Sequence, residues 1–346
     1  MSDRVHDVVV AGSGVAGLSA AVYAARADLD PLVLEGDEPG GQLTLTTDVE
    51  NYLGFPDGVG GMELIQRGRE QAERFGAEFE HGLIESADLD GQPMKLSLST
   101  GETLRTRALI VATGASARWV GADGEDELMG YGLSTCATCD GAFHRGDDVL
   151  VVGGGDSAME EALFLAKFAD SVTVVHRRDR LRASEIMAER ARTHDAIEFA
   201  WNTEVVALHG SQEEGLTGAT LVSHPDGYPS EKYDAGGDVS TRDVAVGGVF
   251  YAVGHEPNTA FLEDSAVELD DDGYVQTTSA GDTWATTETA VEGVFAAGDV
   301  MDRDYQQAVT AAGMGSMAAL DAEAWLESNA HRSAATTEPV RPEADD

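Results

Sequence analysis

Short apolar runs alternate with helix-like segments through most of the chain. The run Val8–Ala11 is followed by a helix of small and apolar residues over Leu18–Ala25 and by a second apolar run, Leu32–Leu34. The run Val149–Val152 begins the same order again. Apolar strands that alternate with helices predict parallel sheets covered by helices. We therefore expect an α/β fold, and the length of 346 residues allows two domains.

Three later segments repeat the strand pattern. Leu109–Gly114, Phe250–Asn258 and Gly293–Val300 each consist of an apolar run that ends in a glycine turn. We interpret Phe250–Asn258 as the return of the chain to the first domain, and we expect a helix over Gln306–Leu326. Residues 328–346 are polar and have no hydrophobic period, so they predict a disordered tail.

A glycine-rich turn connects the first strand to the first helix. It reads Gly12-Ser13-Gly14-Val15-Ala16-Gly17, and Glu35 follows the second strand. In this setting Gly12 makes the turn, Gly14 lets the backbone approach a pyrophosphate, and Gly17 lets the helix pack on the strand. Glu35 is placed to accept hydrogen bonds from ribose hydroxyls. This is the pattern of a dinucleotide site.

A second copy of the turn lies in the middle of the chain. Its segment 153–158 includes Gly153, Gly155, Asp156 and Ser157, and it precedes an expected helix over Met159–Phe168. Two such units predict two Rossmann-like, three-layer domains. The position equivalent to Glu35 holds His176, so the two units differ in chemistry.

Arginines follow the second unit where the first has its carboxylate. The segment 176–182 contains His176, Arg177, Arg178, Arg180 and Arg182. Arginines bind a 2′-phosphate bidentately, whereas a carboxylate would repel it. The second unit therefore favours NADPH over NADH, against the alternative of a solvated basic patch.

The only two cysteines are Cys136 and Cys139, and Asp140 follows directly. Thiols at this spacing can close a disulfide, with one thiolate attacking and the other resolving. Asp140 is placed to move the proton that this exchange requires. A zinc site is an alternative, but His144 and His176 fit no zinc pattern and we expect no metal. A pair of inert thiols is the other alternative.

Several polar or small residues lie where a ligand could contact them. Gln42 and Asn51 belong to the polar segment 40–56, which reads as a loop over a ligand, with a plain surface loop as the alternative. The first turns of the helix from Gln306 are rich in small residues that let a flat ligand approach. With the ends of the apolar runs they complete the candidates taken from the pattern: Gln42, Asn51, Thr113, Gly114, Gly298, Asp299 and Ala308.

The composition is strongly acidic. Twenty-two basic and 63 acidic residues give a formal charge of −41. Such a field repels nucleic acid and anionic membranes. Scattered acids are typical of proteins adapted to multimolar salt, although an ordinary acidic enzyme is the alternative. No apolar run is long enough to span a membrane, and residues 1–7 do not form a signal peptide, so we expect a soluble, cytoplasmic protein.

As a set, these motifs resemble the low-molecular-weight thioredoxin reductases, which are class II pyridine nucleotide-disulfide oxidoreductases. The motifs are Gly12–Gly17, Gly40–Leu43, Glu50-Asn51, Cys136–Gly141, Gly153–Ala158, His176–Asp179, Gly254–Asn258 and Gly298–Val300. The resemblance implies FAD in a discontinuous domain of residues 1–117 and 246–327. It implies NADPH in an inserted domain of residues 118–245, and it implies a homodimer.

The resemblance also implies roles for individual residues. Cys139 would meet the flavin, Cys136 would attack the disulfide of thioredoxin, and Asp140 would be the acid/base. The adenosine half of FAD would contact Gly12, Gly14, Gly17 and Glu35. The ribityl chain and the flavin ring would contact Gln42, Asn51, Asp299, Gln307 and Ala308. NADPH would contact Ser157, Arg177, Arg178 and Arg182. One departure is Gln306, where the family usually has an arginine associated with the partner or the flavin edge.

We hypothesise that electrons pass from NADPH through FAD to the Cys136–Cys139 disulfide and on to thioredoxin. Both the nicotinamide and the cysteines need the flavin, yet both belong to the inserted domain. We therefore expect rotation of that domain about hinges near 115–120 and 245–250. The alternatives are reduction of a peroxiredoxin or of a small disulfide, and a flavin redox sensor without turnover.

Overall fold

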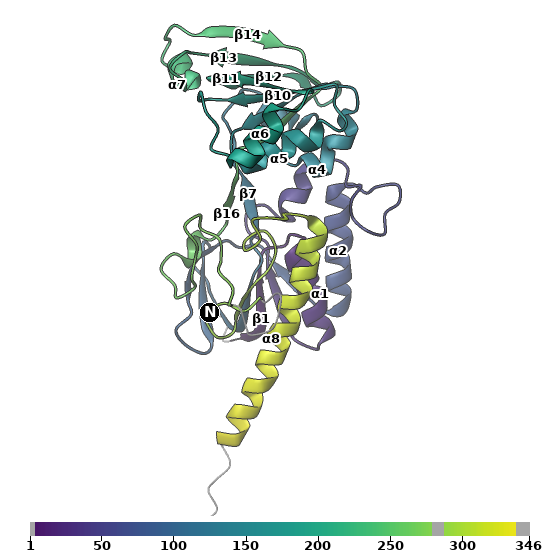
Figure 1. Ribbon diagram of the computed structural model, residues 1–346. Coiled ribbons are helices and arrows are strands. Elements are labelled where there is room, and N and C mark those ends of the chain that lie inside the picture. Colours follow the sequence, from purple (N-terminus) through teal and green to yellow (C-terminus); the bar gives the residue numbers. More distant parts are fainter. Residues whose placement is uncertain (1–3, 279–286, 337–346) are drawn as a thin grey trace, which may run out of the picture.

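The computed structural model of the chain describes residues 4–278 and 287–336. It has two lobes joined by a narrow connection (Figure 1). Each lobe contains a parallel sheet with helices on one face and antiparallel strands on the other side. The expected α/β class with two Rossmann-like domains is confirmed.

The first lobe is built on one mixed sheet. Its strands are β1 (Val5–Ala11), β2 (Pro31–Leu34), β3 (Glu78–Glu80), β4 (Ile84–Asp88), β5 (Met94–Leu98), β6 (Thr103–Val111) and β17 (Val294–Ala296). The order is β3-β2-β1-β6-β5-β4, with β17 beside β6. Strands β3, β2, β1, β6 and β17 are parallel, and β5 and β4 continue the sheet antiparallel.

Alternation along β1 divides the core of this lobe. Val8 and Val10 pack with the helices, whereas Val9 and Ala11 pack on the opposite face with residues of β4, β5 and β17. The helical elements are α1 (Val15–Arg26), α2 (Gly61–Phe75), α8 (Ala308–Thr336), η1 (Gly41–Leu45) and η3 (Ala260–Leu262). Helix α1 packs between α2 and α8.

The second lobe contains a five-stranded parallel sheet. Its strands are β8 (Leu133–Ser134), β9 (Asp148–Gly153), β10 (Ser171–His176), β11 (Ile197–Trp201) and β15 (Gly248–Ala252), in the order β11-β10-β9-β15-β8. Its helical elements are α3 (Glu125–Leu128), α4 (Ala137–Asp140), η2 (Gly141–His144), α5 (Asp156–Leu165), α6 (Glu185–Arg192) and α7 (Pro229–Asp234). A three-stranded antiparallel sheet covers the other face: β12 (Thr203–Ser211), β13 (Gly215–Ser223) and β14 (Ser240–Val244).

The boundary of the second lobe differs from the one that we expected. Strand β15 pairs in parallel with β9, with Phe250 opposite Val151. It therefore completes the second sheet instead of returning the chain to the first domain at residue 246. The return lies at β16 (His255–Pro257), which pairs antiparallel with β7 (Ala115–Ala117). These two strands form the connection between the lobes in Figure 1.

The end of the chain also differs from the prediction. Helix α8 begins at Ala308 and continues to Thr336, so the expectation of disorder was wrong for residues 328–336. Alanine-rich composition in this stretch favours a helix even without an apolar stripe. The rest of the predicted tail, residues 337–346, lies outside the described part of the chain.

Candidate active site

A cavity of about 1240 Å³ lies between the two lobes. The first glycine turn and the ends of β2 and β17 form one wall, and the cysteine motif forms part of the opposite wall. Fourteen predicted site residues line it: Gly12, Ser13, Gly14, Glu35, Gln42, Asn51, Thr113, Gly114, Cys136, Cys139, Ser157, Asp299, Gln307 and Ala308. The fold thus brings the first nucleotide motif and the redox pair to one space.

The glycines of the first turn are required by close backbone contacts. Gly12 has a left-handed φ of 110°, and a Cβ there would lie 2.2 Å from the carbonyl oxygen of Ala112. A Cβ on Gly17 would lie 1.9 Å from the carbonyl oxygen of Gly12. Ser13 fixes the facing loop, because its hydroxyl accepts a hydrogen bond from the Gly40 amide at 2.9 Å. The turn therefore keeps the N-terminus of α1 open to a ligand.

The unpaired carboxyl oxygen of Asp299 is the clearest indication that a ligand binds in the cavity. Its Oδ1 atom is buried and has no hydrogen-bond partner among the described residues. Burial raises the pKa of its carboxyl to about 7, and the neighbouring Asp302 adds to the shift. A buried, unpaired acceptor on a cavity wall fits a ligand with hydroxyl groups. The residues present therefore fit the flavin dinucleotide that the sequence predicts.

Glu35 directly follows β2 and lines the cavity. Its carboxylate forms an ion pair with the guanidinium of Arg69 on α2, and the side chain is mostly buried. Arg69 also binds Glu73 at 2.9 Å. The carboxylate is thus oriented before any ribose arrives, and its second oxygen can still accept a hydroxyl.

Cys136 and Cys139 form a disulfide with a Cα–Cα distance of 5.3 Å. Cys136 precedes α4, and Cys139 lies within this single turn. Asp140 ends the turn. Burial raises the pKa of its carboxyl, and the Ser134 hydroxyl and His144 act in the opposite direction. A carboxyl with a raised pKa directly after the cysteine pair is suited to hold and return the proton of thiol–disulfide exchange.

The Gln307 side chain connects the first lobe to the redox motif. Its Nε2 donates to Thr138 Oγ1 at 3.3 Å and lies 4.0 Å from Cys136 Sγ. Its Oε1 accepts from Asn51 Nδ2 at 3.3 Å. Three predicted site residues, Asn51, Gln307 and Cys136, are therefore joined in one chain of contacts across the cavity.

The loop that carries Gln307 is fixed at two points. Asp302 accepts hydrogen bonds from the backbone amides of Asp304, Tyr305 and Gln306 at 3.0–3.3 Å. Gln306 has a left-handed φ of 47°, and its carbonyl accepts from Gln307 Nε2 at 3.1 Å. The Asp302 cap therefore holds the backbone turn at Gln306 without an arginine at that position.

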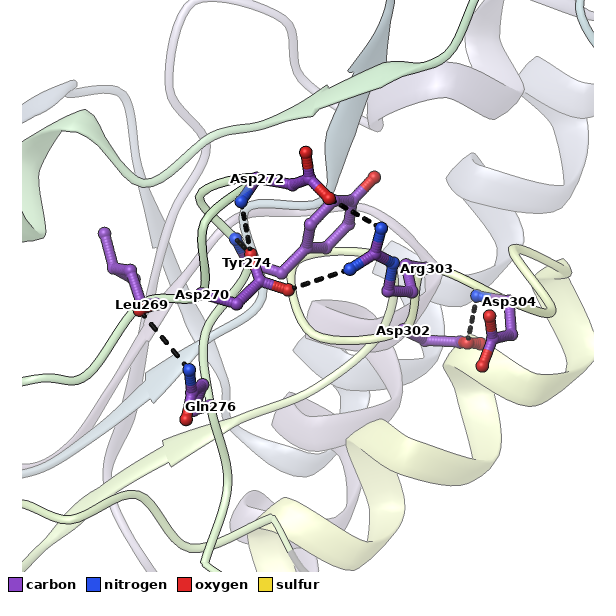
Figure 2. A network of polar contacts seen from close by, with 8 residues as sticks. All are labelled: Leu269, Asp270, Asp272, Tyr274, Gln276, Asp302, Arg303 and Asp304. Carbon is purple, nitrogen blue, oxygen red and sulfur yellow. Dashed lines mark hydrogen bonds and ion pairs between the residues drawn. The ribbon is translucent and has the colours of Figure 1, made fainter. Parts of the chain in front are cut away.

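The second fixed point is Arg303, shown in Figure 2. Its guanidinium binds Asp272 at 2.6 Å and Asp270 at 3.2 Å, and it lies 5.6 Å from the Tyr274 ring centre. Asp270 in turn accepts the amides of Asp272 and Tyr274 at 2.9 Å. The network ties the loop after β17 to the turn at 270–274.

The second glycine turn is closed by contacts within its own lobe. Asp156 accepts the amide and hydroxyl of Ser184 at 2.9 and 2.7 Å. The His176 ring packs on Gly154, where a Cβ would lie 2.3 Å from the ring. Its Nε2 donates to the Arg180 carbonyl at 2.9 Å, and burial lowers its pKa. A neutral His176 therefore shapes the turn and contributes no charge.

The arginines after β10 gather around Tyr228. The guanidinium groups of Arg177 and Arg178 lie 5.2 and 5.3 Å from its ring centre. Arg178 Nε is buried and has no hydrogen-bond partner in the described part of the chain. Within the described residues, none of Arg177, Arg178, Arg180 and Arg182 takes part in an ion pair. Cations left unpaired in so acidic a chain are suited to a phosphate.

The predicted residues do not all meet. Gly17, Asp140 and Gly298 are not among the residues that line the cavity, and neither are Gly153, Gly155, Asp156, His176 and the arginines after β10. Only Ser157 of the proposed NADPH set reaches the cavity. In this arrangement the disulfide, and not the arginine cluster, faces the first nucleotide site.

Sequence reasoning missed four residues of the site. Thr138, Arg303 and Tyr228 act through contacts between distant segments, which no local pattern indicates. Glu161 could have been noticed, because it is a carboxylate between the buried Ala158, Met159 and Ala162 of α5. Its Oε2 atom is buried and has no hydrogen-bond partner within residues 4–278 and 287–336, and the residue lines the cavity.

Comparison with known proteins gives a consistent result. The family model described as pyridine nucleotide-disulphide oxidoreductase matches residues 6–315. A thioredoxin reductase of Mycolicibacterium smegmatis is 50% identical over 325 residues, which is 94% of this chain and 98% of that protein.

Two solved structures share the fold of this chain but superpose on it with different TM-scores. Thioredoxin reductase from Streptococcus pyogenes MGAS5005 has a TM-score of 0.84 at 37% identity, covering 94% of this chain and 100% of that one. Lactococcus lactis thioredoxin reductase, in a structure titled FR conformation, has a TM-score of 0.59 at 36% identity, covering 93% and 99%. The two TM-scores differ although identity and coverage are nearly the same.

Proposed function

The chain belongs to the thioredoxin reductases of the pyridine nucleotide-disulphide oxidoreductase family, and we propose that it reduces the disulfide of thioredoxin with electrons from NADPH. It is an oxidoreductase, and its family depends on FAD and NADPH. One observation supports the assignment most directly. The Cys136–Cys139 disulfide and the orphaned Asp299 line the same cavity.

FAD, when bound, supplies the transfer of two electrons from the nicotinamide to the disulfide. The first glycine turn would hold its pyrophosphate at the N-terminus of α1, and Glu35 its adenosine ribose. Asp299 would accept a hydroxyl of its ribityl chain. Gln42, Asn51, Gln307 and Ala308 line the same cavity as Asp299 and the disulfide.

The second lobe would hold NADPH on its own surface. Arg177, Arg178 and Arg182 are free of ion pairs within the described residues and would bind the 2′-phosphate. The turn at Gly153 and Gly155 would approach the pyrophosphate. Phosphate recognition by these cations supports NADPH over NADH.

After reduction, Cys136 is the attacking thiol and Cys139 the thiol that meets the flavin. Attack of the Cys136 thiolate on thioredoxin breaks the partner's disulfide and forms a mixed disulfide. Cys139 then displaces the partner and restores the intramolecular bond. Asp140, with its raised pKa, takes and returns the proton of this exchange.

The nicotinamide must reach the flavin while the disulfide moves away. Only two strands, β7 and β16, connect the lobes in the part of the chain that the structure describes (Figure 1). The lower TM-score to the Lactococcus structure at equal identity supports rotation of one lobe against the other. The corrected boundary moves the second hinge from 245–250 to the residues around Gly254.

The test is reduction of purified thioredoxin by NADPH in dilute and in multimolar salt. Activity is expected, and Cys139→Ser should abolish it while the protein stays yellow and its flavin remains reducible by NADPH. If the activity on a peroxiredoxin or on a small disulfide equals or exceeds the activity on thioredoxin, that molecule would be assigned as the substrate instead of thioredoxin. If no disulfide substrate is turned over, the remaining alternative is a flavin redox sensor without turnover.

The described residues contain no helix that is long and apolar enough to cross a membrane. The expectation of a cytoplasmic homodimer stays a prediction, and light scattering in high salt tests the oligomeric state.

A further inference from the structure

A second carboxyl group lies against the redox turn at the end opposite Asp140. Glu161 belongs to α5, which packs against α4, and the backbone amide of Ala137 lies close enough to its carboxyl group to lower the pKa of that group. Ala137 is the first residue of α4 and follows Cys136 directly. The carboxyl group of Glu161 therefore lies beside the peptide bond that follows Cys136, the proposed attacking cysteine.

The second oxygen of Glu161 has no role in the proposed cycle. Oε2 is buried and unpartnered among the described residues, although Glu161 lines the cavity between the lobes. Around it α5 buries Ala158, Ala162 and Leu165 completely. A carboxylate in such surroundings is disfavoured relative to the neutral acid.

The chemistry of the group follows from this burial. Desolvation raises the pKa of Glu161 to about 8, the Ala137 amide opposes the shift, and the negative charge of Glu160 adds to it. At neutral pH the group is therefore mainly a carboxylic acid. The charged or titratable groups on α5 itself and on the elements packed against it are Asp156, Glu160, Asp140, His144, Asp148, His176, Tyr251, Glu185, Glu189, Arg190 and Arg192. Of these, only Glu160 contributes an electrostatic shift.

We propose that Glu161 is a positioning residue for the dithiol: from α5, on the wall of the cavity, its carboxyl group lies against the start of α4 and sets the electrostatic environment of Cys136. The inference rests on the proposed redox function of the cysteine pair. Two electrons convert the disulfide into two sulfurs that bind two protons, or one proton while Cys136 remains a thiolate. A carboxylate at Glu161 would repel that thiolate and favour the protonated sulfur.

Alkylation by iodoacetamide tests this directly, because only the thiolate reacts. The full chain with its bound FAD is reduced with a dithiol, and the modification rate of Cys136 is followed by mass spectrometry as a function of pH. The variants are Glu161→Gln, which keeps an acceptor for Ala137 and cannot ionise, and Glu189→Gln as a control on the exposed face of α6. Glu161→Met, neutral and of similar length, is the second variant if the first does not fold.

In the unmodified chain the titrations of Glu161 and Cys136 are coupled, so the alkylation rate of Cys136 should rise over a broad range of pH. In Glu161→Gln or Glu161→Met it should rise in a single step with its midpoint lower by on the order of half a pH unit. Glu189→Gln should match the unmodified chain. Superimposable profiles for the unmodified chain and the neutral variants would overturn the proposal, even if thioredoxin is reduced normally. If the Cys136 alkylation profiles of the unmodified chain and the neutral variants differ but the protein does not reduce thioredoxin, the proposed function is refuted. The coupling between Glu161 and Cys136 then still holds.

Discussion

Gln307 Nε2 donates a hydrogen bond to Thr138 Oγ1 at 3.3 Å, and this contact joins the first lobe to the turn that carries the disulfide. A second hydrogen bond between the lobes runs from Thr47 Oγ1 to the Gly130 carbonyl at 3.3 Å. Both contacts must break if the second lobe rotates. They therefore stabilise the arrangement in which the disulfide faces the cavity.

Replacing Thr138 with valine should destabilise that arrangement. One neutral hydrogen bond contributes about 0.5–1.5 kcal/mol, so the rotated arrangement should gain about two- to tenfold in population. If flavin reduction by NADPH requires rotation, its rate in stopped-flow absorbance should rise by the same factor. Thr193→Val is the control, because Thr193 bonds only to carbonyls of α6. An unchanged rate in Thr138→Val would show that this contact does not limit the motion.

Asp299→Asn should have opposite effects on the apoprotein and on flavin binding. The folded-state pKa of Asp299 is about 7, above the usual value of 3.8. Because the folded state holds the proton more tightly, the free energy of unfolding of the apoprotein falls as pH rises from about 4 to about 7, by on the order of 4 kcal/mol at most. The asparagine variant lacks this loss, so above pH 7 its apoprotein should be the more stable.

Flavin affinity should change in the other direction. An amide oxygen is a weaker acceptor than a carboxylate, so FAD affinity should fall about tenfold in Asp299→Asn. Denaturant unfolding of the two apoproteins at pH 4 and pH 8 and a fluorescence titration with FAD measure both effects. Equal apoprotein stability at pH 8 would contradict the burial of a charged Asp299.

Arg177→Ala should lower kcat/KM for NADPH by about 10- to 100-fold, because a charge-assisted hydrogen bond to phosphate contributes about 1.5–3 kcal/mol. The value for NADH should change much less, since that cofactor lacks the 2′-phosphate. Arg192→Ala is the matched control, because Arg192 lies on α6 in an exposed ion pair with Glu185. Equal losses for both cofactors would assign Arg177 a structural role.

Much of the site was predictable because its motifs are local. The turns at Gly12 and Gly153 and the cysteine pair depend on residues a few positions apart, and the structure places each between the expected strand and helix or turn. The sequence misassigned β15, because an apolar run such as Gly248–Ala252 fits either sheet. Pairing with β9 decides its place, and that pairing joins segments about 100 residues apart.

The sequence by itself determined the two nucleotide turns, the absence of a carboxylate at His176 and the spacing of the two thiols. These features follow from backbone sterics and from charge within a short segment. Only the tertiary structure decided that Glu161 lies against Ala137, that Arg303 fixes the Gln307 loop, and that the disulfide instead of the arginine cluster faces the cavity. Those relationships depend on how two separately folded lobes and distant loops pack together, and no local pattern encodes that packing.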